Sequence, residues 1–171
     1  IQICRMMWSQ SPATFEGKHY SIREAYCHPH PHPHPPVMVG GAGEKYVLRV
    51  VAEHADWWNY IYTDRATYAH KQAVLKEHCQ AVGRDYEQIV QVAASHILVG
   101  HNEAEIKRMA AQPHVRPTGA NGFAGTPAQA TELLLAAIEQ GADRINVAFA
   151  DTPRQESTQL FIEEVLPHLQ K

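Results

Sequence analysis

Residues 35–56 decide the fold, and they read PPVMVGGAGEKYVLRVVAEHAD. A short apolar run at 37–39 is followed by two glycines, and a third glycine, Gly43, opens a run with apolar residues at helical spacing. Glycine lacks a Cβ, so the chain can turn sharply and approach a ligand closely. N–H groups at a helix start, with the positive end of the helix dipole, attract anions. The stretch therefore predicts a strand, a turn and a helix, and the turn is either a phosphate site or a turn without a ligand.

The composition excludes several classes of function. The 171 residues are enough for one domain with a core. The net charge of −3 gives no electrostatic reason to expect a nucleic acid, and no apolar run has the length of a membrane span. Three scattered cysteines, Cys4, Cys27 and Cys79, have neither metal-pair spacing nor the even count of a disulfide framework. With no signal peptide visible, a cytoplasmic protein is expected.

The region before the sheet, residues 1–36, is irregular. Residues 1–8 have the pattern of the end of a helix, and 15–22 alternate around a turn, which predicts a small hairpin. Alternating histidine and proline follow, and because proline fixes φ and removes N–H donors, an extended connector is expected. In polyproline geometry only His28 and His34 share a face, roughly 19 Å apart. That arrangement is poor for chelation, so no metal site is predicted.

Residues 37–171 form a second region, in which apolar strands alternate with helices. The expected strands are 37–39, 58–62, 91–98 and 144–148. Side chains that can cap a helix start are Asp64, Asn102, Thr126 and Thr152, and the last three precede a glutamate or glutamine by three positions. A segment rich in glycine and proline, 113–125, is expected to form a mobile loop.

Four strand–helix units in series imply an α/β fold with parallel strands and right-handed crossovers. A complete eight-unit barrel needs about 250 residues. Four units in this length are therefore either a small open doubly wound sheet or half of a (βα)8 TIM-type barrel.

Most distinctive side chains in these strands are interpreted as packing residues. One of Trp57 and Trp58 is expected in the core, because barrel interiors are filled with side chains. His96 lies in an apolar strand and is interpreted as a core histidine rather than a catalytic base. Asn59 can line a pocket. No Ser-His-Asp, Cys-His or paired-carboxylate pattern has local support, so no catalytic residue is assigned.

A series of short motifs resembles the luciferase-like family of flavin and deazaflavin oxidoreductases. The motifs are Met7-Trp8, 13–20 (ATFEGKHY), 35–45 (PPVMVGGAGEK), 48–59 (LRVVAEHADWWN), 78–85 (HCQAVGRD), 125–129 (GTPAQ), 141–144 (GADR) and 164–167 (EVLP). Their order and spacing are together specific, and they cover nearly the whole chain. The resemblance is closest to the branch that uses coenzyme F420, a deazaflavin.

The resemblance implies the C-terminal half of a single barrel, from the end of the fourth helix through strands five to eight. It implies that the glycine turn meets the phosphate of a coenzyme F420 or FMN cofactor. The residues carried over are Gly40, Gly41, Ala42, Gly43, Glu44 and Lys45, with Asn59 as a further candidate. The family's cofactor-ring and substrate groups come largely from the first four strands, which are absent here. The connector also departs from the family, with His-Pro where relatives usually show Lys-Pro.

Two functions are expected from this combination. The first is half of a luciferase-like oxidoreductase that holds the cofactor phosphate and is inactive alone. The second is a non-catalytic half-barrel that assembles or binds a phosphorylated ligand. The first and last strands, 37–39 and 144–149, leave open edges, which predict a homodimer.

Overall fold

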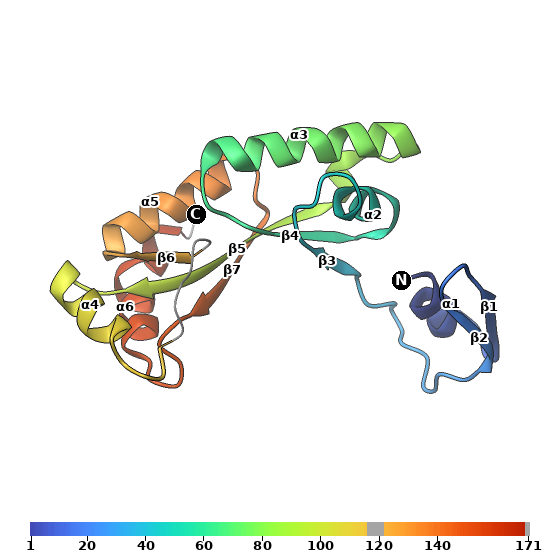
Figure 1. Cartoon of the computed structure of the whole chain (residues 1–171), viewed down its shortest axis with the longest axis horizontal. Coiled ribbons are helices and arrows are strands. Elements are labelled where there is room, and N and C mark those ends of the chain that lie inside the picture. Colours follow the sequence, from blue (N-terminus) through green and yellow to red (C-terminus); the bar gives the residue numbers. More distant parts are fainter. Residues whose placement is uncertain (116–121, 170–171) are drawn as a thin grey trace. The chain divides into compact units, whose positions relative to one another are not determined.

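The structure is a computed structural model that describes residues 1–115 and 122–169. It divides into two compact units, Ile1–Val37 and Met38–Lys171. The first unit holds helix α1 (Gln2–Ser9) and an antiparallel hairpin of strands β1 (Ala13–Glu16) and β2 (Ser21–Ala25), as Figure 1 shows. The helix and the hairpin agree with the sequence patterns of this region.

The histidine–proline segment of the first unit is not a regular extended helix. The chain bends at His28–Pro29 and again at His32–Pro33. The rings of His28 and His30 stack with their centroids 5.2 Å apart. The expectation that only His28 and His34 share a face is therefore wrong, because the bends interrupt the polyproline repeat. Across residues 1–115 and 122–169, no group of three or more His, Cys, Asp or Glu is placed to hold a metal ion.

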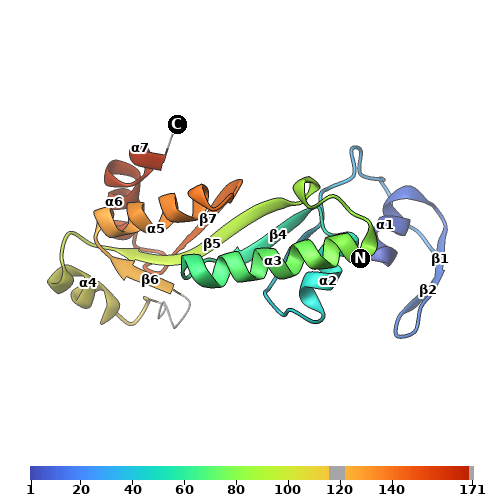
Figure 2. The same cartoon turned by 90° about the horizontal axis from the view of Figure 1, so that it is seen from above.

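The second unit is a parallel sheet with helices between its strands (Figure 2). Its strands are β3 (Met38–Gly40), β4 (Trp57–Ile61), β5 (Val90–Val99), β6 (Gly122–Gly125) and β7 (Arg144–Phe149). Its helices are α2 (Val47–His54), α3 (Arg65–Val82), α4 (Glu103–Ala110), α5 (Pro127–Glu139), α6 (Glu156–Glu164) and α7 (Leu166–Leu169), with a 3-10 turn, η1 (Tyr86–Gln88). Every strand pair in this sheet is parallel, as alternating strands and helices predict.

Strand β5 is the centre of the sheet. It pairs with β4 through residues 90–94, with β6 through 96–99 and with β7 through 92–97. Since β7 overlaps both other ranges, it lies on the opposite edge of β5, and β6 continues the line of β4. The strand order is therefore β3-β4-β5-β7, which is also the order in the sequence. This order without a reversal belongs to a barrel segment rather than to a doubly wound sheet.

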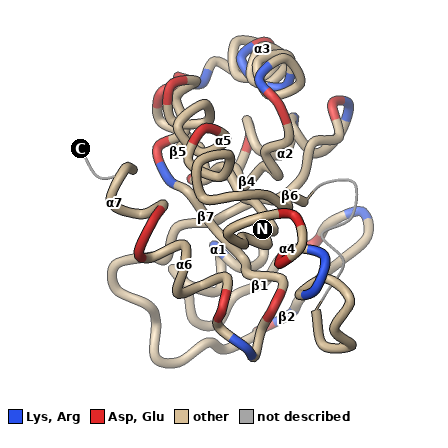
Figure 3. Tube along the Cα trace, turned by 90° about the vertical axis from the view of Figure 1, so that its left-hand side faces the viewer, with Lys and Arg blue, Asp and Glu red and all other residues tan. Residues whose placement is uncertain are grey.

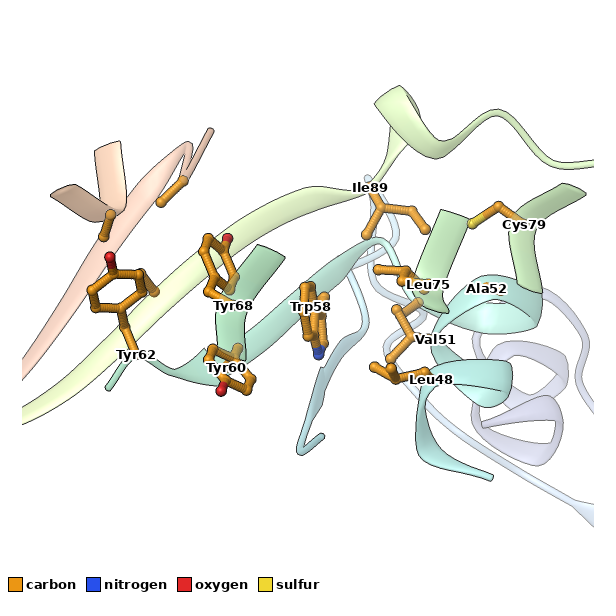
Figure 4. Close-up of a cluster of buried hydrophobic side chains, with 14 of the residues drawn as sticks. Leu48, Val51, Ala52, Trp58, Tyr60, Tyr62, Tyr68, Leu75, Cys79 and Ile89 are labelled. Carbon is orange, nitrogen blue, oxygen red and sulfur yellow. The ribbon is translucent and has the colours of Figure 1, made fainter. Parts of the chain in front are cut away.

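Helices α2, α3, α5 and α6 cover one face of this sheet, whereas Leu98 of β5, which has the opposite parity, packs with Met109 of α4. Successive side chains of a strand point to opposite faces, and the buried residues of one parity face the helices. Trp58 and Tyr60 of β4 pack against α2 and α3 (Figure 4). Ile97 and Val99 of β5 pack against α5 and α6. The four expected strands are present and parallel, with α2, α3, α5 and α6 on a shared outer face as in half of a (βα)8 barrel, and β6 is a fifth strand that was not expected.

The opposite parity forms the inner face of the sheet, which is at least partly exposed. Its partly or fully exposed members are Met38, Trp57, Asn59, Ile61, Val90, Ala94, His96, Arg144, Asn146 and Ala148. The guanidinium of Arg144 lies 4.6 Å from the ring centroid of Trp57. The expectation that His96 is a core residue is wrong, because its side chain is exposed on the inner face of this sheet.

Two helix starts and one loop differ from the sequence patterns. Helix α2 begins at Val47, four residues after the expected Gly43. Thr152 does not cap α6, since its hydroxyl donates to the carbonyl of Phe149. The Asp151 carboxylate instead accepts a hydrogen bond from the N–H of Ser157. Strand β6 forms at the end of the expected loop, of which residues 116–121 lie outside the described residues.

Charged side chains of both signs lie on α3 and α4 (Figure 3). Arg65 of α3 pairs with Glu139 of α5, and Arg108 of α4 pairs with Glu156 of α6. These exposed pairs join neighbouring helices but contribute little stability, because water and salt screen them. No helix in the described part of the chain is both long and apolar enough to cross a bilayer.

Candidate functional site

The glycine turn, residues 40–46, borders a cavity at the C-terminal ends of β3 and β4. The cavity has a volume of about 520 Å³. Its lining comes from the turn, from β4 and from the start of α3: Gly40, Gly41, Ala42, Asn59, Tyr60, Ile61, Thr63 and Thr67. This is the edge of a parallel barrel where binding sites are found. The fold therefore brings Gly40, Gly41, Ala42 and Asn59 together, as the sequence candidates require.

Gly41 fixes the path of the turn. Its φ of +123° lies in a region that side chains disfavour, which accounts for glycine here. Its N–H donates to the carbonyl of Asn59 at 3.1 Å, and its carbonyl accepts a hydrogen bond from Nε1 of Trp58 at 2.9 Å. A side chain on Gly41 would also place its Cβ 3.3 Å from Val47 Cγ1. The turn is thus held against β4 at one glycine.

The N–H groups that follow Gly41 are free for a ligand. Within the described residues, those of 42–46 donate to no protein acceptor, whereas that of Leu48 donates to Gly43. Helix α2 begins at Val47 with no side chain capping its start. These N–H groups and the helix dipole favour an anion beside the turn. Because the N–H of Gly41 is already bonded, the donors that remain begin at Ala42.

Asn59 contributes an unused acceptor on the inner face. Its Oδ1 is buried and has no hydrogen-bond partner among the described residues. Its Nδ2 lies 3.8 Å from the position that a Cβ of Gly40 would take. Buried polar atoms are rarely left unpaired, so this oxygen is suited to accept a hydrogen bond from a ligand hydroxyl or N–H.

Glu44 and Lys45 do not line the cavity. The Glu44 carboxylate accepts hydrogen bonds from Lys71 and from His70 of α3, the latter at 3.0 Å. The hydrogen bond from Lys71, followed by that from His70, holds the pKa of Glu44 below its usual value. The ammonium of Lys45 lies 5.2 Å from the ring centroid of Tyr46. The side chain of Glu44 therefore points to α3, and its negative charge is neutralised there.

A second cavity of about 380 Å³ lies at the same edge of the sheet. It is lined by residues of the segment that leads into α3, of β6 and of α5: Tyr62, Asp64, Arg65, Phe123, Ala124, Gln129, Glu132, Leu133 and Ala136. Sequence reasoning missed this cavity, and it missed Thr63 and Thr67 of the first. The available signal was position for Thr63, Thr67 and the residues 62–65, because they follow the end of β4 at one edge of a parallel sheet.

The fold is similar to several solved enzymes. One is an F420-dependent secondary alcohol dehydrogenase solved with an F420-acetone adduct, with a TM-score of 0.79 and 14% identity. Another is the coenzyme F420 dependent tetrahydromethanopterin reductase from Methanopyrus kandleri, with a TM-score of 0.74 and 14% identity. A third is the monooxygenase RslO1 from Streptomyces bottropensis, with a TM-score of 0.69 and 16% identity.

These similarities cover almost all of this chain but only part of the other proteins. The alignments cover 99%, 99% and 97% of this chain and 60%, 61% and 58% of the three structures, in the same order. The chain therefore spans about 60% of the length of the structures that it resembles. At this identity the likeness shows the fold.

The sequence itself gives a family assignment. No curated protein matches the sequence. A family model described as luciferase-like monooxygenase matches residues 1–160, which is most of the chain. The chain belongs to the luciferase-like monooxygenase family.

Proposed function

We propose that this chain binds the phosphate of FMN or of coenzyme F420 at the glycine turn and forms the cofactor-binding half of an oxidoreductase. The observation that carries the proposal is the cavity of about 520 Å³ beside the turn. The free N–H group of Ala42 borders it, the free N–H groups of 43–46 follow in the same turn, and its lining residues include no carboxylate to repel a phosphate.

The remaining residues of the cavity fit the rest of such a cofactor. The unpaired Oδ1 of Asn59 can accept a hydrogen bond from a hydroxyl of the cofactor's ribityl chain. Ile61 and Tyr60 add apolar wall, which ligand cavities generally need. A bound flavin or deazaflavin supplies hydride-transfer chemistry, while the protein supplies binding and orientation. Two of the similar structures are named for F420, which agrees with a deazaflavin as one of the two cofactors.

FMN is expected to bind this chain several-fold more tightly than riboflavin, which lacks only the phosphate. Replacing Gly41 with valine should abolish that preference, because valine is strained at φ +123° and would press on Val47. Titrations of the protein followed by flavin fluorescence measure both affinities.

Gly83 provides the matched control for this substitution. It also has positive φ, at +68°, but no atom lies within 4 Å of the position of its Cβ, and it ends α3 away from the cavity. Gly83→Val should therefore carry the backbone strain and keep the preference for FMN. Equal affinity of the wild-type protein for FMN and riboflavin would refute the phosphate site, and so would an unchanged preference in Gly41→Val.

The isolated chain is expected to show no redox turnover above buffer. Preorganised groups must surround the whole cofactor for efficient catalysis, and the inner face of this sheet is partly exposed. The measurement is F420 reduction with 2-propanol, together with consumption of reduced FMN under oxygen. Turnover by homogeneous protein with either cofactor would contradict this expectation.

The proposal extends to assembly. Strand β3 pairs with β4 alone and β7 with β5 alone among the described residues, so each has an open edge. We infer that two copies pair β3 of each chain with β7 of the other, which supplies the eight strands of a closed barrel. Open parallel edges and an exposed sheet face both favour such pairing.

A further inference from the structure

The glycine turn is tied to helix α3 by one residue, Glu44. Its carboxylate accepts hydrogen bonds from Lys71 and His70, and its backbone carbonyl accepts one from Nε2 of His78 at 2.7 Å. The three partners lie on the same helix and span two turns of it. Glu44 therefore joins the middle of the turn to α3 at both its side chain and its main chain.

This tie complements the one at Gly41. Gly41 is bonded to Asn59 and Trp58 of β4, so the first part of the turn is held by the sheet. Glu44 holds the later part from the helix side. The free N–H groups of 42–44 lie between or at these two attachments, and that of Lys45 follows directly. A turn with glycines at 40, 41 and 43 would otherwise lose considerable backbone entropy when it orders around a ligand.

The negative charge of Glu44 is also paired, so that it does not repel an anion at the turn. A carboxylate beside free N–H groups would repel a phosphate, but this one is neutralised by a lysine whose side chain is only 18% exposed. Ion pairing and hydrogen bonding at α3 keep the carboxylate out of the cavity lining. The turn thus presents its N–H donors without its own negative charge.

We propose that Glu44 is a positioning residue, which fixes the N–H groups of 42–45 for a phosphate by tying the turn to α3. The inference rests on the proposed function, since it assigns a role to a residue behind the phosphate site. It replaces direct contact between Glu44 and the cofactor with an indirect role. Preorganisation of this kind raises affinity by lowering the ordering cost of binding.

The test compares Glu44→Ala, Glu44→Gln and the wild-type protein. Hydrogen–deuterium exchange over residues 41–48 reports the order of the turn without any ligand, and the ratio of FMN to riboflavin affinity reports the phosphate site. Glu44→Ala should speed exchange in this segment and lower the affinity ratio several-fold. Glu44→Gln keeps an oxygen acceptor for Lys71 and His70. Its exchange rate over 41–48 and its affinity ratio should therefore lie between those of Glu44→Ala and the wild-type protein.

Glu53→Ala is the matched control. Glu53 also belongs to an exposed ion pair, with Arg49 one turn away on α2, but it does not touch the turn. This variant should change neither the exchange of 41–48 nor the affinity ratio. Unchanged exchange in Glu44→Ala would overturn the tie, and faster exchange with an unchanged ratio would overturn the positioning role. A wild-type protein without preference for FMN refutes the proposed function and the positioning role together, while the exchange data still decide the tie.

Discussion

Replacing Trp58 with alanine is expected to lower the free energy of unfolding by about 3–5 kcal/mol, the range for large aromatic side chains removed from a core. Trp58 is fully buried. Its ring lies 5.8 Å from that of Tyr68 and 5.4 Å from that of Tyr60, and Leu75 belongs to the same cluster (Figure 4). Alanine would leave a cavity between β4 and α3. Denaturant unfolding followed by circular dichroism measures the loss.

The neighbouring tryptophan is the control. Trp57 points to the inner face, where it is partly exposed and lies under Arg144. Trp57→Ala removes a similar volume from a position that water already reaches, so its cost should be much smaller. Equal losses in the two variants would show that the alternation of faces along β4 is wrong.

Trp58 also links the core to the glycine turn. Its Nε1–H donates to the carbonyl of Gly41. Trp58→Phe keeps most of the ring packing and removes this donor, so it should cost less stability than alanine. It leaves a carbonyl of the turn without its partner, which typically costs roughly 1–3 kcal/mol when the group is buried. A loss in Trp58→Phe as large as in Trp58→Ala would assign the effect to the hydrogen bond rather than to packing.

The sequence predicted helix starts correctly where the cap residues were adjacent to the helix. Thr126 and Gln129 form a complete capping box, and Asp64 accepts a hydrogen bond from the N–H of Thr67. The same motif failed at Thr152 because Asp151, one residue earlier, provides a buried carboxylate for the N–H of Ser157. A local pattern cannot show which of two neighbouring acceptors the tertiary fold buries.

The strands show a similar division. The four expected strands and their parallel order followed from the alternation of strands with helices, together with the family resemblance, whereas β6 was not predicted. The error at His96 arose because β5 is mostly buried on both faces, so hydrophobicity alone did not reveal which parity faces the helices. In a strand that is buried on both faces, the hydrophobic residues are nearly continuous, so the sequence does not show which side chains point to the helices.

The candidate site was predictable only in part. Glycines after a strand pointed to the turn, and the structure places three of its residues with Asn59 around one cavity. The role of Glu44, later in the turn, could not be predicted in this way. The direction of its side chain depends on Lys71 and His70, which lie more than twenty positions away in the sequence. Contacts at that separation leave no local signal, so the residue type alone could not distinguish a ligand contact from a tie to α3.

The isolated chain is expected to sediment at twice the 19.2 kDa of one copy at micromolar concentration. The proposed pairing closes both open edges and covers the inner face, and obligate interfaces of this kind bury more than about 2,000 Å². Met38 tests it, because its side chain lies on the inner face of edge strand β3 and is 44% exposed in one copy. Met38→Lys should leave the fold of one copy intact but place an unpaired charge inside the assembled barrel.

Ile162 is the matched control for this variant, since it is 54% exposed but lies on helix α6 rather than on an edge strand. Ile162→Lys should keep the double mass, whereas Met38→Lys should shift sedimentation equilibrium to the mass of one chain. Circular dichroism of Met38→Lys must show that the helices and strands remain, so that dissociation is separated from unfolding. A wild-type protein that sediments as a single chain with a cooperative melt would refute the pairing. A double mass that survives Met38→Lys would place the interface elsewhere on the molecule.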